Sequence, residues 1–215
     1  GRVPNAARSV YLNKSQPPFL PSLVRMSEPI RKRTFGDKAT EKWVKEAYDV
    51  MSSDFHDFWR EDGGRNVGEI NGEKVHLSRW GGPNHKFAMD ESGFDTTSRF
   101  YGKTMDLAPP DLNAFLWGYS RDMEAIALRL RDKAQEEGNQ KDFLKYSSEG
   151  AFWGNEAKQI KHDVIKHCWD EESGMFRDYR FQGENQGLQK DEDALSAVVA
   201  PLWVGMLDPK DPKEK

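Results

Sequence analysis

The residues best suited to acid–base chemistry lie close together between positions 90 and 100. This segment, Asp90-Glu91-Ser92-Gly93-Phe94-Asp95-Thr96-Thr97-Ser98-Arg99-Phe100, combines three carboxylates with several hydroxyl groups, an arginine and two aromatic rings. A general acid needs a carboxyl group whose pKa is raised by apolar surroundings. Asp95, which lies between Phe94 and Phe100 in the sequence, fits that requirement. The alternative is a structural loop in which Asp95 caps a turn through its own backbone.

Other kinds of catalytic site have little support. His162 and His167 are five residues apart, so they do not share a helix face as a metal-binding pair at i and i+4 would. Cys168, the single cysteine, lies on an apolar stripe and is expected in the core. The sequence has no G-x-S-x-G nucleophile elbow and no glycine-rich phosphate loop. We therefore predict neither a metal site nor a cofactor.

The overall composition is typical of a folded protein with an aromatic interior. The chain has 215 residues, of which 36% are hydrophobic, 32% charged and 12% aromatic, and its formal net charge is −4. So many aromatic residues argue against disorder. The interspersed charges argue against a nucleic-acid or membrane-surface partner, and no apolar run is long enough to span a membrane. An aromatic interior also suits the stacking of sugars.

The spacing of the apolar residues predicts an all-α architecture. Helices are expected from Pro17-Pro18 onward, over about 37–60, from Asp111 as N-cap to about 138, over 140–168, and over 193–206. We expect glycines at 150 and 154 to weaken the fourth helix, and Pro201 to kink or split the fifth.

About 50 residues rich in glycine, asparagine and proline separate the second and third predicted helices. Long connections of this kind tend to be functional, so the function is expected in the loops. Within this connection, Asn71-Gly72 predicts a pair of short strands near residues 68–76. A short extended segment is expected over 175–181.

Five segments, in the right order, resemble motifs of the trehalases, inverting glycoside hydrolases that cleave α,α-trehalose. The segment 91–100 is similar to the family's E-S-G-W-D-x-S-S-R-W, and 110–116 is similar to its V-D-L-N-x-x-L; the other three are 1–18, 169–179 and 200–205. The resemblance implies an (α/α)₆ toroid, a ring of inner and outer helices. Residues 1–215 would form part of that catalytic domain, truncated at both ends.

The resemblance also implies roles for individual residues. Asp95 would be the general acid that protonates the glycosidic oxygen, and Gly93 would bring the backbone close to the sugar. The substrate, a small disaccharide, would be bound by residues of the first motif, namely Asn5, Lys14, Ser15 and Gln16. The family's general base is a glutamate in a later segment than those matched here, so no base is assigned within these residues.

Two departures from the family's pattern leave the substrate open. The family's arginine before the S-Q pair is Lys14 here, which lacks the planar donor fork. The R-P-E triplet expected before Asp95 has at best Gly82-Pro83-Asn84 as its counterpart, in a connection that is shortened. Trehalose is the first expectation. The alternatives are another α-glucoside, such as a glucosylglycerate or an oligosaccharide, and a non-catalytic sugar-binding helical domain.

Overall fold

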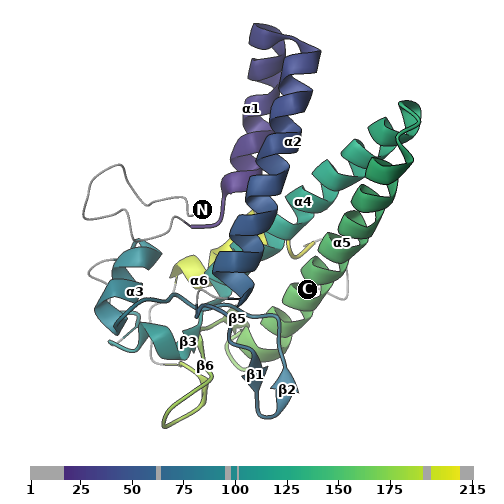
Figure 1. Ribbon diagram of the computed structural model, residues 1–215. Helices are drawn as coiled ribbons and strands as arrows, with labels where there is room; N and C mark the ends of the chain where they lie inside the picture. Colours follow the sequence, from purple (N-terminus) through teal and green to yellow (C-terminus); the bar gives the residue numbers. More distant parts are fainter. Residues whose placement is uncertain (1–16, 62–63, 95–97, 101, 191–194, 209–215) are drawn as a thin grey trace.

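Two antiparallel helix pairs dominate the computed structural model, which describes residues 17–61, 64–94, 98–100, 102–190 and 195–208 (Figure 1). Helices α1 (Leu20–Phe35) and α2 (Asp37–Ser53) form one pair, and α4 (Pro110–Glu136) and α5 (Gln140–Cys168) form the other. The short strands and α3 (His85–Ser92) gather at one end of the two pairs. The predicted all-α class is therefore confirmed.

The turn between α4 and α5 follows from its local sequence. Gly138 takes the left-handed conformation, with φ of 68°, just after α4 ends. Asn139 then caps α5, its side chain accepting a hydrogen bond from the Asp142 amide at 3.1 Å. The predicted range of this helix, 140–168, is confirmed.

The glycines at positions 150 and 154, expected to weaken this helix, lie inside α5, which is continuous from Gln140 to Cys168. Both face α4. A Cβ on Gly150 would lie 3.0 Å from Leu128 Cδ2, and one on Gly154 would lie 2.6 Å from Glu124 Oε1. The two glycines allow α4 and α5 to approach each other closely, because a larger side chain at either position would obstruct the contact.

The first pair departs from its predicted limits in two ways. Helix α1 is longer than the short helix expected, with Pro21 in its first turn and Pro29 inside it. The helix predicted over 37–60 is α2 followed by a π-helical segment, η2 (Asp54–Glu61). Such wide turns are rare and often occur at functional sites.

The long connection between η2 and α4 is more ordered than its composition indicates. The predicted hairpin is present, as β1 (Glu69–Ile70) and β2 (Glu73–Lys74) pair antiparallel around Asn71 and Gly72, both at positive φ. Helix α3, which we did not predict, begins after Asn84, whose side chain accepts from the Phe87 amide at 2.9 Å. A short 3₁₀ turn, η3 (Thr104–Asp106), and β3 (Leu107–Ala108) complete the connection.

The extended segment predicted over 175–181 forms short strands. Strand β5 (Met175–Phe176) pairs with β4 (Trp169–Asp170), and β6 (Tyr179–Arg180) lies between β3 and β7 (Gly187–Leu188), all antiparallel. Helix α6 (Leu195–Trp203) continues through Pro201 without splitting and ends three residues before the predicted limit.

The core lies where the two helix pairs meet the short elements, and it is built largely from aromatic rings. Its largest fully buried side chains include Tyr48, Phe55, Trp59, Trp80, Tyr119 and Trp153. Phe55 and Trp153 pack edge to face with their centroids 4.9 Å apart. Cys168 is fully buried, as predicted, whereas Phe152 of the same helix is 40% exposed. Among the described helices, none combines the length and apolar character needed to cross a membrane.

Candidate active-site loop and the ion pairs that flank it

The structure describes both flanks of the segment that carries Asp95. Gly93 is the predicted site residue that it places. The other predicted site residues, Asn5, Lys14, Ser15, Gln16 and Asp95, lie outside the described residues. The geometry of the site is therefore built from α3 and Gly93–Phe94 on one side and from residues 98–100 on the other.

Gly93 ends α3 in the left-handed conformation, with φ of 81°. Glycine is favoured there because it has no Cβ to clash with the following carbonyl group. A Cβ added at this position would meet no atom within 4 Å. The backbone conformation thus gives a local reason for the glycine, and the close approach of a sugar to Gly93 stays a prediction.

A buried ion pair holds the segment on the side of α3. The Glu91 carboxylate, which is fully buried, accepts hydrogen bonds from Arg65 Nη2 at 2.6 Å and from Arg65 Nε at 3.0 Å. The Gly81 amide donates to the same carboxylate at 3.2 Å. The Arg65 guanidinium also packs on the Phe58 ring, 3.7 Å from its centroid. Paired, charge-assisted hydrogen bonds of this kind fix orientation as well as distance.

A second buried cluster holds the segment on the side of Arg99. The Arg99 guanidinium donates to Asp178 through Nε at 2.8 Å and Nη2 at 2.6 Å. It also donates to Asp111 through Nη1 at 2.7 Å and Nη2 at 2.9 Å. Asp111 lies in the first turn of α4, and Asp178 lies just before β6. One side chain therefore joins the segment to two elements distant in the sequence.

Asp111 is not the N-cap that we predicted. Helix α4 begins at Pro110, Pro109 occupies the cap position, and no side chain caps the helix there. The Asp111 carboxylate instead binds Arg99 and accepts from the Leu112 amide at 3.0 Å. A negative charge in the first turn also interacts favourably with the helix dipole.

The charges of this cluster stabilise one another. Burial raises the pKa of Asp111, but the Arg99 guanidinium outweighs that effect and holds the pKa below its usual range. Burial lowers the pKa of Arg99, but the carboxylates of Asp111 and Asp178 together outweigh that effect and raise the pKa well above its ordinary value. Nearby, burial raises the pKa of the Cys168 thiol well above normal, so this sulfur is poorly suited to act as a nucleophile.

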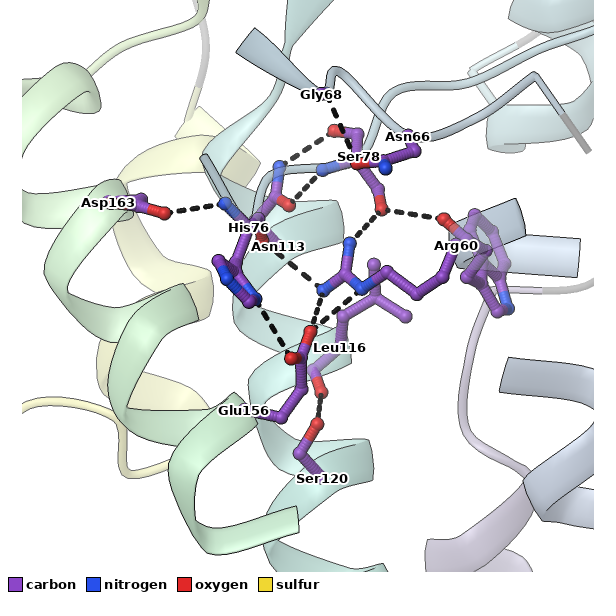
Figure 2. A network of polar contacts seen from close by, with 11 residues as sticks. Arg60, Asn66, Gly68, His76, Ser78, Asn113, Leu116, Ser120, Glu156 and Asp163 are labelled. Carbon is purple, nitrogen blue, oxygen red and sulfur yellow. Dashed lines mark hydrogen bonds and ion pairs between the residues drawn. The ribbon is translucent and has the colours of Figure 1, made fainter. Parts of the chain in front are cut away.

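The start of the connection is attached to α4 through Asn113. Its amide accepts from the Ser78 backbone N–H at 2.7 Å and donates to the Ser78 carbonyl at 2.9 Å. It also donates to the Pro109 carbonyl at 2.8 Å. Figure 2 shows the Asn113 side chain lying directly against the strand-like backbone at Ser78.

The same backbone is attached to α5 by a neighbouring polar network. Arg60 of η2 pairs with Glu156 at 2.7 Å and donates to Ser78 Oγ at 2.7 Å (Figure 2). His76 Nδ1 lies 2.9 Å from Glu156 Oε2, and the His76 amide donates to Asp163 at 2.6 Å. Burial raises the pKa of Glu156, but His76 and Arg60 outweigh that effect and lower it overall.

Sequence reasoning placed these residues in motifs without finding what they bind. Glu91, Arg99 and Asp178 were counted as members of polar or extended segments. The available signal was a charged residue next to large apolar ones, as in Arg99-Phe100 and Asp178-Tyr179. Charged side chains are seldom fully buried unless they are paired, so this pattern indicates buried ion pairs. It does not indicate which residues pair.

Metal binding finds no support in the part of the chain that the structure describes. Within those ranges, no group of three or more histidine, cysteine, aspartate or glutamate side chains is arranged to hold an ion.

Comparison with known proteins identifies relatives along the whole chain. The cytosolic neutral trehalase of Neurospora crassa is 28% identical over 259 residues, covering 98% of this chain and 34% of that protein. That of Beauveria bassiana is also 28% identical, with the same coverage. The cytosolic neutral trehalase of Saccharomyces cerevisiae is 32% identical over 123 residues, or 57% of this chain and 15% of that protein. The chain thus spans about a third of the length of the first two relatives.

The fold agrees with these relatives. A solved structure of the Saccharomyces cerevisiae neutral trehalase superposes with a TM-score of 0.70 at 23% identity, covering 97% of this chain and 44% of that one. This likeness fits the expectation that the chain adopts part of an (α/α)₆ toroid.

The trehalase family model matches residues 1–86 and 83–215. The two stretches meet where the connection before Asp95 was expected to be shortened. The alignment with the Neurospora crassa protein is longer than this chain, so that relative has residues without a counterpart here. Since the two matches together cover the chain from end to end, the chain belongs to the trehalase family.

Proposed function

We propose that the complete protein hydrolyses α,α-trehalose to two glucose molecules with inversion. The observation that carries this proposal is the family match over residues 1–215, which includes the segment that carries Asp95. The ion pairs of Glu91 and Arg99 support it, because they fix both flanks of that segment in the core. A catalytic side chain must be held in place by rigid neighbouring residues.

In the proposed mechanism Asp95 is the general acid. Its proton passes to the glycosidic oxygen as the bond to the anomeric carbon breaks. A glutamate from another part of the complete protein activates water on the opposite face of the ring. In inverting enzymes the two carboxyl groups lie about 6.5–9.5 Å apart, which leaves room for that water. Inversion at one anomeric carbon gives β-glucose, and the other glucose leaves as the α-anomer.

The remaining predicted residues bind the sugar. Asn5, Ser15 and Gln16 provide donors and acceptors for hydroxyl groups, and Lys14 provides a cation. Gly93 leaves room for the ring beside the end of α3. In this proposal, residues 1–215 form part of a toroidal catalytic domain, and the reaction needs no cofactor.

A second candidate substrate is a different α-glucoside. Two observations favour it. The family model matches the chain in two parts that overlap at residues 83–86, and Gly82-Pro83-Asn84 stands where the R-P-E triplet is expected. Loss of an arginine and a glutamate there would remove strong contacts to the sugar. Assays with trehalose, glucosylglycerate and α-glucosyl oligosaccharides separate these substrates. Binding of a sugar without hydrolysis of any would indicate the non-catalytic alternative.

The test is glucose release from α,α-trehalose by the complete protein, with the anomers followed by NMR. The wild type should release one β-glucose and one α-glucose per trehalose. Asp95→Asn should abolish turnover and leave the melting temperature within a few degrees of the wild type. Full activity in Asp95→Asn would exclude Asp95 as the acid, and two α-glucose products would exclude inversion.

A further inference from the structure

The Arg99 side chain is held in the core by two carboxylates and two aromatic rings. Its side chain is 2% exposed, and those of Asp111 and Asp178 are 2% and 0% exposed. The aromatic rings of Phe94 and Phe100 lie 5.4 and 5.0 Å from its guanidinium carbon. The cluster therefore belongs to the core, although Ser98, the residue before Arg99, is exposed.

The geometry of the cluster requires an arginine. A guanidinium has a planar fork that can pair with two carboxylates along two of its edges, and Arg99 uses Nε, Nη1 and Nη2 in this way. A lysine ammonium would keep the charge but has no planar fork, so it would not reproduce both paired contacts. Arg99→Lys therefore removes the paired contacts with little change in charge.

We propose that Arg99, held by Asp111 and Asp178, is a positioning residue that sets the placement of Asp95 for proton transfer. The inference rests on the proposed function, since it takes Asp95 as the acid. Asp95 lies between the two flanks that the ion pairs of Glu91 and Arg99 hold. Loss of the ion pairs at Arg99 would release one of these two flanks.

Catalysis is sensitive to such a change. Productive geometry is held to within about 0.5 Å, and a misplacement of about 1 Å costs on the order of 10²-fold in rate. In the proposed function, residues of the first motif and Gly93 bind the sugar, and Arg99 does not contact it. Loosening of the Arg99 cluster should therefore lower kcat much more than it raises KM.

The experiment compares Arg99→Lys and Asp178→Asn with Arg60→Lys in the complete protein. Arg60 is a matched control because it forms an equally short, largely buried pair with Glu156, at 2.7 Å, and contacts neither Asp111 nor Asp178 in the described hydrogen bonds. All three changes disturb an arginine–carboxylate pair, so all three should lower the melting temperature. Trehalose hydrolysis is measured below the lowest melting temperature, together with hydrogen exchange of residues 93–98.

In Arg99→Lys we expect kcat to fall about 10- to 100-fold with KM changed less than threefold. In Asp178→Asn, which keeps the contact between Arg99 and Asp111, kcat should fall about 5- to 20-fold. In Arg60→Lys, kcat should stay within twofold of the wild-type value. Amide exchange of residues 93–98 should accelerate in the first two variants and not in the control. Asp178→Asn also provides a test if Arg99→Lys does not fold.

Two results would overturn the positioning role. One is a folded Arg99→Lys or Asp178→Asn enzyme whose kcat matches that of Arg60→Lys, in which case the proposed function would stand without it. The other is unchanged exchange of residues 93–98 in both variants. If the wild type hydrolysed no trehalose, the proposed function would fail, and the exchange comparison alone would decide whether Arg99 orders the segment.

Discussion

Asp111 and Asn113 lie two positions apart at the start of α4 and hold two distant points of one connection. Asn113 binds the backbone of Ser78 through its amide, and Asp111 binds the guanidinium of Arg99. Helix α3 and the segment that carries Asp95 lie between those two points in the sequence. The start of one long helix thus serves as the common base for the proposed active-site loop.

Replacement of Asn113 by alanine should test this base from its other side. Asn113→Ala leaves the Ser78 N–H and C=O without their partner in a fully buried place, and each such group costs about 1–3 kcal/mol. We expect the free energy of unfolding to fall by about 2–4 kcal/mol, measured by urea denaturation. Asn139→Ala, which removes an exposed helix cap, should cost only about 1 kcal/mol. Equal losses in the two variants would contradict the assignment.

The identity of residue 93 separates a backbone requirement from a substrate requirement. Gly93→Ala should lower the free energy of unfolding by about 1–2 kcal/mol, because a Cβ is unfavourable at positive φ. Gly93→Asn should cost less, since asparagine tolerates the left-handed conformation. If the backbone also approaches the sugar, both variants should lose kcat/KM for trehalose, and the larger asparagine should lose more. Normal kinetics in Gly93→Asn would leave only the conformational reason.

Local patterns predicted the long elements well. The 140–168 range follows from the sustained helical spacing of its apolar residues, and the hairpin follows from Asn71-Gly72. Both features depend on residues that are neighbours in the sequence. Resemblance to the family then identified the segment around Asp95, which composition alone left undecided between a catalytic and a structural loop.

The remaining features depend on contacts between residues distant in the sequence. Arg99 and Asp178 are 79 positions apart, and no period or spacing links them. Asp111 follows two prolines and has a typical capping side chain, so sequence reasoning assigned it to the helix terminus. In the structure, the Asp111 carboxylate is oriented toward its buried partner Arg99. Helix α3 escaped prediction because it is short and lies in a glycine-rich connection.

The first motif should contribute to substrate binding and little to folding. We expect Asn5→Ala and Gln16→Ala each to raise KM for trehalose about 5- to 30-fold, because a lost hydrogen bond to a sugar hydroxyl costs about 1–2 kcal/mol. Kinetics of the complete protein and its melting temperature check this together. Ser9→Ala, in the same stretch but outside the predicted site, is the control. Unchanged KM in both site variants would remove the first motif from the site.

Asp54, at the start of η2, should make the stability depend on pH. It is buried beside Tyr119, whose hydroxyl group donates to the Met51 carbonyl at 2.7 Å and lies 3.4 Å from the Asp54 carboxylate, and burial raises the pKa of Asp54 to about 6. The folded state therefore holds the Asp54 proton more tightly than the unfolded state, and stability falls as pH rises from about 4 to 6, by about 3 kcal/mol. Asp54→Asn should remove that fall, so its advantage over the wild type should be absent at pH 4 and largest at pH 7. Urea denaturation across this range measures it, with the exposed Asp57→Asn as control, and a fall in Asp54→Asn as steep as in the wild type would contradict the assignment.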